Sequence, residues 1–279
     1  MKLIHAFVIL GLFSKLTPQS LGAEGSQARP IVPLVHAHAH NDYEHTRPLL
    51  DALAQGFCSM EADIHLVDGK LLVAHDLEDA KPELTLERLY LEPLRQRAQQ
   101  NGGRVYRNGP TITLLVDVKS EAAPTWLVLD PVLKQYADIL TRFGNTRADP
   151  KAVTVIISGN RARDLVGKQQ IRYAALDGRL PDLEASETPA LIPLISDNWQ
   201  AHFKWRGEGP LQKDEEKRLG KIITLAHQQG RKVRFWGTPD RAEFWKALSS
   251  AGVDLINADD LSGLRAFLLS TERGPEPQR

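Results

Sequence analysis

The sequence has a single cysteine, Cys58, among its 279 residues. One cysteine excludes an intrachain disulfide, and its place in the apolar run 57–60 favours a buried thiol over a nucleophile. An excess of charge of either sign is also missing, because 35 basic residues balance 35 acidic ones. Without a basic surplus we expect no nucleic-acid partner, and no feature of the sequence indicates a stable protein partner.

Long hydrophobic runs are absent after residue 23, so we expect no membrane span in the mature chain. The N-terminus carries Lys2, a mostly apolar stretch over 4–13 and small residues at 20–23. This pattern is typical of a secretory signal peptide; an apolar N-terminal helix of the fold is the alternative. We therefore expect a signal peptide over 1–23, a linker over 24–30, and a secreted or periplasmic protein.

Eight apolar stretches of strand length alternate with helical patterns along the rest of the chain. They lie at 31–35, 59–64, 112–118, 153–157, 171–176, 191–195, 232–236 and 253–257. This alternation predicts a parallel sheet, and eight strands in one domain favour a closed (β/α)8 barrel over an open doubly wound sheet. We expect one TIM-type barrel over 31–270, a β-hairpin at Asp68-Gly69 and a disordered tail over 271–279.

Three histidines, His36, His38 and His40, stand at every second position after the first strand. In an extended strand they would all point the same way. An H-x-H start is typical of zinc-dependent amidohydrolases and histidinol-phosphatase-type barrels, but such a site needs further ligands at the ends of later strands. The last two histidines, His202 and His227, do not follow strands, so zinc is the weaker alternative.

Acidic residues stand on the next two strands. Glu61 and Asp63 lie two residues apart, on one face of a strand, and Asp117 lies at the end of the third strand. Burying three carboxylates together is costly unless a cation compensates them. Carboxylate oxygens select hard divalent ions, so the pattern predicts one Mg²⁺ or Ca²⁺. An ordinary network of ion pairs with lysine or arginine explains the same pattern.

The spacing of these residues resembles that of a known superfamily, since His40 precedes Glu61 by 21 residues and His75 follows it by 14. The segment 61–76, EADIHLVDGKLLVAHD, resembles the E-x-D, D-G and H-D motifs of glycerophosphodiester phosphodiesterases and phosphatidylinositol-specific phospholipase C-like enzymes. The segments HNDY, LYLEPL, RFW and VDLINADD point to a narrower group. They resemble phosphodiesterase-superfamily proteins typified by fungal altered-inheritance-of-mitochondria proteins.

The resemblance implies a TIM-type barrel that cleaves a phosphodiester by attack of a neighbouring hydroxyl. It assigns the acid/base roles to His40 and His75. The metal ligands that it implies are Glu61, Asp63 and Asp117. Candidate substrate contacts at the strand ends are Asn41, Lys119 and Trp236. The chain lacks the H-R-G and E-N-T motifs of glycerophosphodiesterases, so its substrate is left open as a small-molecule or lipid phosphodiester.

The roles of the clustered histidines leave alternatives. A shift of two residues at the strand end would give His38 the role of His40, although the family pattern favours His40. His36 is expected to lie in the core or to support the site. A degenerate barrel that binds a phosphorylated ligand without turnover is the rival of another class, and the intact acidic and histidine set favours an enzyme.

Overall fold

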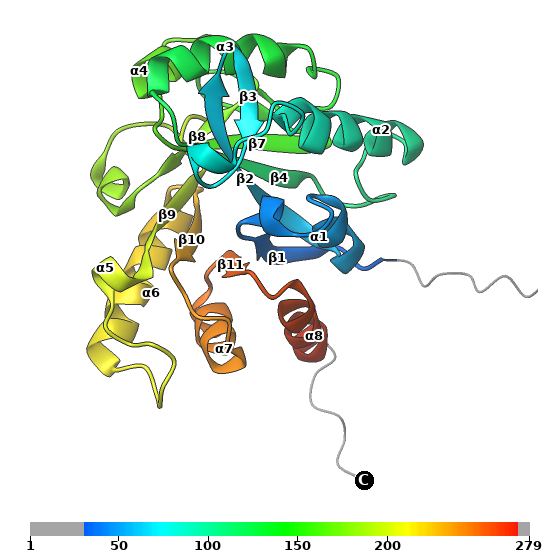
Figure 1. Cartoon of the computed structure of the whole chain (residues 1–279). Coiled ribbons are helices and arrows are strands. Elements are labelled where there is room, and N and C mark those ends of the chain that lie inside the picture. Colours follow the sequence, from blue (N-terminus) through cyan, green and yellow to red (C-terminus); the bar gives the residue numbers. More distant parts are fainter. Residues whose placement is uncertain (1–30, 273–279) are drawn as a thin grey trace, which may run out of the picture. The chain divides into compact units, whose positions relative to one another are not determined.

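The computed structural model describes residues 31–272, where eight parallel strands close into a barrel (Figure 1). The strands are β1 (Leu34–Ala39), β2 (Phe57–Val67), β4 (Ile112–Val118), β7 (Val153–Gly159), β8 (Ala175–Gly178), β9 (Leu194–Asn198), β10 (Lys232–Trp236) and β11 (Leu255–Ala258). They are hydrogen-bonded in the order β1-β11-β10-β9-β8-β7-β4-β2, and a further pairing of β1 with β2 closes the ring. The predicted (β/α)8 barrel is confirmed. The expected signal peptide and linker, and the tail from 273, lie outside the described residues.

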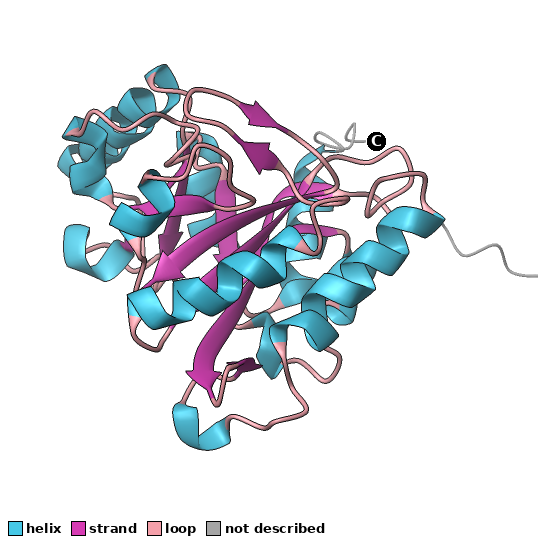
Figure 2. Ribbon diagram, turned by 90° about the horizontal axis from the view of Figure 1, so that it is seen from above, coloured by secondary structure: helices cyan, strands magenta, loops and turns pink. Residues whose placement is uncertain are grey.

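Helices flank the strands (Figure 2). They are α1 (Leu50–Gln55), α2 (Glu92–Gln100), α3 (Ala122–Lys134), α4 (Arg163–Gly167), α5 (Trp199–His202), α6 (Lys213–Gln228), α7 (Ala242–Ala251) and α8 (Leu261–Glu272). Three short 3₁₀ helices, η1 (Asp42–Glu44), η2 (Leu77–Asp79) and η4 (Leu180–Glu184), and one π-helix, η3 (Glu87–Leu91), complete the set. Leu219, Ile223 and Ala226 recur at helical spacing on α6, and all three are buried. Between residues 31 and 272 no helix combines the length and the apolar character needed to cross a membrane.

The predicted hairpin extends the second strand. Asp68 and Gly69 both adopt positive φ, 47° and 76°, as a tight hairpin turn requires. Strand β3 (Lys70–Val73) then returns antiparallel to β2, with Ile64 paired to Val73. A second small pair, β5 (Arg142–Phe143) and β6 (Ala148–Asp149), lies outside the barrel sheet.

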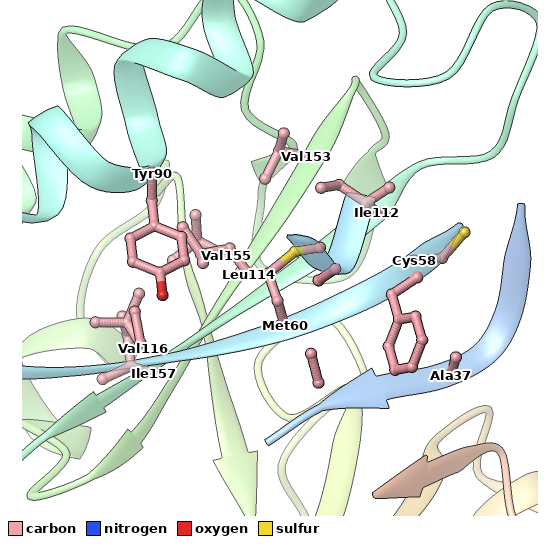
Figure 3. Packing of buried hydrophobic residues seen from close by; sticks show 14 of the residues in the cluster. Ala37, Cys58, Met60, Tyr90, Ile112, Leu114, Val116, Val153, Val155 and Ile157 are labelled. Atoms are coloured by element: carbon pink, nitrogen blue, oxygen red, sulfur yellow. The ribbon is translucent and has the colours of Figure 1, made fainter. Parts of the chain in front are cut away.

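Alternate residues of the strands form two cores. Figure 3 shows the larger one, where Met60, Leu114 and Val155 pack side by side on adjacent strands. A smaller cluster consists of Leu115 and Ile156, the next residues after Leu114 and Val155, together with Leu194 of β9 and Leu255 of β11. Because successive side chains of a strand point to opposite faces, this smaller cluster fills the barrel interior, on the face that also carries the acidic residues.

The first strand differs from its prediction. It begins at Leu34, and its register with β2 shifts between Leu34 and His38. The shift breaks the alternation of sides, so the three histidines do not share a face. His36 is exposed, His38 is buried, and His40 lies beyond the end of the strand.

Candidate functional site

A cleft of about 200 Å³ is lined mostly by residues near the C-terminal ends of the barrel strands, with His75 added from just after the hairpin strand β3. This is the end at which barrels of this type carry their active sites. The lining residues are His40, Asn41, Glu61, His75, Asp117, Lys119, Ser158, Arg179, Arg234 and Trp236. Seven of the eight predicted site residues are among them, and the eighth, Asp63, is buried beside them.

Three carboxylates meet beneath this cleft. Asp63 of β2 is paired in register with Asp117 of β4, and Glu61 lies two residues earlier on the same face of β2. One oxygen from each side chain lies within 4.8 Å of the others. No other group of three potential ligands is as close within residues 31–272, so the described structure offers no histidine cluster for zinc.

Two basic side chains pair with these carboxylates. Lys119 Nζ lies 2.9 Å from Asp63 Oδ2 and 3.3 Å from Asp117 Oδ2. The buried Arg234 guanidinium lies 2.6 Å from Glu61 Oε2. The ion-pair network weighed from the sequence therefore exists, but two cations against three carboxylates leave one negative charge uncompensated.

The remaining carboxylate oxygens suit a hard divalent cation. Oδ1 of Asp63 and Oδ1 of Asp117 are buried and have no hydrogen-bond partner among the described residues. Burial and then the charge of Glu61 raise the pKa of Asp63, and a cation beside this carboxylate would favour its ionised form. At Gly159 a Cβ would lie 1.9 Å from Asp117 Oδ1, so only glycine leaves room for that carboxylate. The residues present fit one Mg²⁺ or Ca²⁺.

His40 reaches the cleft from the end of β1. Its backbone N–H donates to the carbonyl of Ala258, and its Nδ1 lies 2.8 Å from Asp259 Oδ1. Burial alone would lower the pKa of His40, but the hydrogen bond to Asp259 and the charge of Glu61 outweigh burial and raise it. With Nδ1 engaged by Asp259, Nε2 is the nitrogen left for a ligand in the cleft.

His75 follows β3 and lies against a tyrosine that the sequence analysis missed. Its Nδ1 lies 3.1 Å from Asp63 Oδ2 and 3.0 Å from the hydroxyl of Tyr43. That hydroxyl also donates to Asp63 Oδ2, at 2.7 Å. His65 Nε2 donates a hydrogen bond to the backbone carbonyl of His75, at 3.1 Å. Tyr43 belongs to the HNDY segment, but the long-range contacts that link it to His75 leave no local pattern in the sequence.

His38, the alternative to His40, does not line the cleft. It is fully buried, with Nδ1 2.7 Å from Ser59 Oγ and Nε2 3.1 Å from Glu61 Oε2. Burial and the nearby Arg234 lower the pKa of His38 to about 3, so the neutral ring donates its Nε2–H to Glu61. The expectation for His36 is wrong, because this exposed ring contacts a backbone carbonyl at the surface.

The loop after His40 is held down by a buried acid. Asn41 turns the chain with a left-handed conformation, at φ 47° and ψ 37°, which asparagine tolerates. Asp42 Oδ2 then accepts hydrogen bonds from the Leu49 backbone N–H, at 2.5 Å, and from the Tyr90 hydroxyl, at 2.9 Å. Burial raises the pKa of Asp42 to about 6.

Three further residues line the cleft without having been predicted: Ser158, Arg179 and Arg234. Each stands at or within two residues of the C-terminal end of a barrel strand. Their position near the ends of predicted strands is the sequence signal from which they could have been predicted. Trp236, which was predicted, lines the cleft from the end of β10.

The comparison with protein families identifies the chain. The model of the AIM6-like phosphodiesterase domain matches residues 26–177, more than half of the chain. The chain belongs to this family. An altered inheritance of mitochondria protein 6 homolog from Arthroderma benhamiae is 30 % identical over 269 residues, covering 86 % of this chain and 85 % of that protein. The altered inheritance of mitochondria protein 6 of Eremothecium gossypii is 29 % identical over 301 residues, covering 95 % and 77 %.

Solved structures show the same fold for this AIM6-like domain. A glycerophosphodiester phosphodiesterase from Parabacteroides distasonis superposes with a TM-score of 0.50 at 15 % identity, covering 85 % of this chain and 98 % of that one. A calcium-dependent phosphoinositol-specific phospholipase C from a Pseudomonas species gives 0.51 at 10 % identity, covering 83 % and 91 %. At these identities the likeness shows the fold alone.

Proposed function

We propose that this chain is a metal-dependent phosphodiesterase in which His40 and His75 form an acid/base pair. The proposal rests on one arrangement: both histidines line the cleft of the carboxylate cluster, and a carboxylate engages Nδ1 of each ring. Imidazole suits proton transfer near neutral pH, and an engaged Nδ1 leaves Nε2 for the substrate. Membership of the AIM6-like phosphodiesterase family supports the same reaction class.

In this proposal Glu61, Asp63 and Asp117 hold one Mg²⁺ or Ca²⁺, which would supply positive charge to the phosphoryl oxygens when bound. The calcium dependence in the description of the Pseudomonas phospholipase adds to the case for testing Ca²⁺. Lys119 contributes a further positive charge at the cleft.

The proposed step needs one proton taken and one proton given. His75 takes the proton of a substrate hydroxyl, whose oxygen forms a bond to phosphorus. The bond between phosphorus and the leaving alkoxide breaks, and His40 gives that alkoxide a proton, so a cyclic phosphodiester and an alcohol result. The raised pKa of His40 favours the protonated ring that an acid requires, which leaves the base role to His75.

The size of the cleft limits the substrate. A volume of about 200 Å³ lies below the roughly 300–1,000 Å³ of pockets that enclose a drug-sized ligand. That is room for a phosphodiester group and a short alcohol, so the acyl chains of a lipid substrate would stay outside. The substrate class is therefore a small phosphodiester, or the headgroup of a lipid, with a hydroxyl next to the phosphate.

The test is a set of phosphodiesters with a neighbouring hydroxyl, incubated with the full chain and Mg²⁺ or Ca²⁺ and followed by phosphorus NMR. We expect a cyclic phosphodiester signal that disappears when the cation is chelated. Glu61→Gln should weaken cation affinity in calorimetry and slow turnover, while the matched control Glu187→Gln, which pairs with Arg163 on α4, keeps both. Turnover that survives chelation, or unchanged cation affinity in Glu61→Gln, would contradict the metal assignment.

A barrel that binds a phosphorylated ligand without turnover is the second candidate. It is favoured by one observation, that Lys119 and Arg234 already occupy oxygens of the three carboxylates. The same experiment separates the two, since a binding protein would bind the diesters in calorimetry and leave their phosphorus spectra unchanged. For either candidate we propose export from the cytoplasm, supported by the N-terminal pattern of residues 1–23.

A further inference from the structure

Arg179 lines the cleft on the side of the barrel opposite His40. It follows β8, which is the fourth strand from β1 in either direction around the closed ring. In an eight-stranded barrel the fourth neighbour lies diametrically across the mouth. A group bound by Arg179 therefore enters the shared cleft from the strand opposite the one that carries His40.

The guanidinium of Arg179 is fixed from below. Its Nη1 lies 2.6 Å from Asp177 Oδ2 and donates to the carbonyls of Gly178, at 3.0 Å, and Ser196, at 3.2 Å. Asp177 is fully buried, and its Oδ2 also accepts from the hydroxyls of Ser158, at 2.8 Å, and Ser196, at 2.5 Å. A buried carboxylate is costly, and here the two serine hydroxyls and the Arg179 guanidinium compensate its charge. The same contacts hold Arg179 in one orientation.

The other edge of this guanidinium remains available. Among the described residues, Nε and Nη2 make one contact, a long one of 3.3 Å from Nη2 to Ser158 Oγ. The side chain is 27 % exposed at the cleft. Nε and Nη2 together present the planar fork of donors that matches two oxygens of a phosphate or carboxylate.

The other two basic side chains of the cleft are committed elsewhere. Lys119 pairs with Asp63 and Asp117, and Arg234 pairs with Glu61, so both serve the carboxylate cluster. Arg179 pairs only with Asp177 among the acidic side chains of residues 31–272, and Asp177 is not part of that cluster. Arg179 thus has a fixed guanidinium that does not pair with the carboxylate cluster, and its free fork is available to an anion other than the reacting phosphoryl group.

We propose that Arg179 binds a second oxyanion of the substrate, a phosphate or a carboxylate, on the alcohol that extends from the scissile phosphodiester toward β8. This rests on the proposed function, because it places the phosphodiester itself at His40, His75 and the carboxylate cluster. A substrate with a cationic headgroup, such as choline, meets like charge at this position and is disfavoured.

The test compares glycerol phosphodiesters of short alcohols that differ only in their terminal group: hydroxyl, carboxylate, phosphate or trimethylammonium. A charge-assisted, bidentate contact should raise kcat/KM of the anionic members over the hydroxyl member on the order of tenfold to a hundredfold. In Arg179→Ala this ratio should fall to about one, and Arg179→Lys should keep part of it because lysine keeps the charge without the fork. The carboxylate and phosphate members show which anion is preferred.

Two further variants keep the result interpretable. Arg179→Ala leaves Asp177 buried without its cation, so the double variant Arg179→Ala/Asp177→Asn removes both charges and keeps the barrel neutral at this point. Arg163→Ala removes an arginine of α4 that pairs with Asp182 and Glu187 outside the cleft, and it should preserve the wild-type ratio.

The outcomes separate the two proposals. A wild-type ratio near one, an unchanged ratio in both Arg179 variants, or an equal loss for all four diesters would overturn the second-anion site. Absence of turnover with every diester would count against the proposed function instead. In that case calorimetric affinities of the same four diesters for wild type and Arg179→Ala still decide the second-anion site by the same ratio.

Discussion

Asp42 makes the stability of the fold depend on pH in a direction opposite to that of an ordinary carboxylate. It is fully buried within the loop that follows His40, and burial raises its pKa from 3.8 to about 6. A carboxyl whose folded pKa is raised binds its proton more tightly in the folded chain. Its contribution to stability is therefore complete below the unfolded pKa and is lost as pH rises through about 6.

The magnitude follows from the shift. A pKa that moves from 3.8 to about 6 corresponds to about 3 kcal/mol between the protonated and the ionised limits. The perturbation is Asp42→Asn, which keeps an acceptor for Leu49 and Tyr90 but cannot ionise. The free energy of unfolding of wild type minus that of the variant should fall by about 2 to 3 kcal/mol between about pH 4 and about pH 7.

The assay is reversible urea unfolding of both proteins across that pH range. The subtraction cancels the pH dependence of all other groups, and Asp149→Asn, at an exposed position on β6, serves as the matched control with a flat difference. A wild-type minus Asp42→Asn difference that stays constant, or that rises with pH, would refute the reasoning that burial dominates at Asp42.

Two further predictions concern the site and the leader. Tyr43→Phe keeps the ring and removes the hydroxyl that contacts Asp63 and His75, so kcat should fall about tenfold to a hundredfold while the unfolding temperature changes little; unchanged turnover would show that the hydroxyl does not position His75. The protein isolated from its native host should begin near Ala23 or Glu24, and N-terminal sequencing that returns Met1 would count against export.

The barrel was predictable because each strand carries its own apolar run and the number of runs selects the closed sheet. The boundaries of its strands were less predictable. The run at 171–176 begins outside the barrel, because Arg172 exchanges backbone hydrogen bonds with Phe143, and β8 starts only at Ala175. That pairing joins distant segments and leaves no local mark. Cys58 is buried as predicted, and burial raises the pKa of its thiol to about 12.

The candidate site shows the same division. Strand periodicity and strand ends are local signals, so the sequence could predict that Glu61, Asp63 and Asp117 lie close together, as they do. The hydrogen bonds that position the site residues could not be predicted, because they join distant parts of the chain. His38 contacts Glu61 across 23 positions, and Tyr43 contacts His75 across 32. The equal spacing of the first three histidines was misleading for a local reason, the register shift within β1.

The most direct measurement of the central claim is the turnover of His40→Ala and His75→Ala on paired diesters with an alkyl or a p-nitrophenyl leaving group. With the alkyl diester each variant should lose about 10²- to 10⁴-fold in kcat, while His227→Ala, on the surface of α6, keeps wild-type turnover. Because p-nitrophenolate leaves without a proton, the p-nitrophenyl diester should partly restore His40→Ala and leave His75→Ala impaired. Rescue of His75→Ala alone would exchange the two roles, and full activity of both variants with the alkyl diester would contradict the acid/base pair.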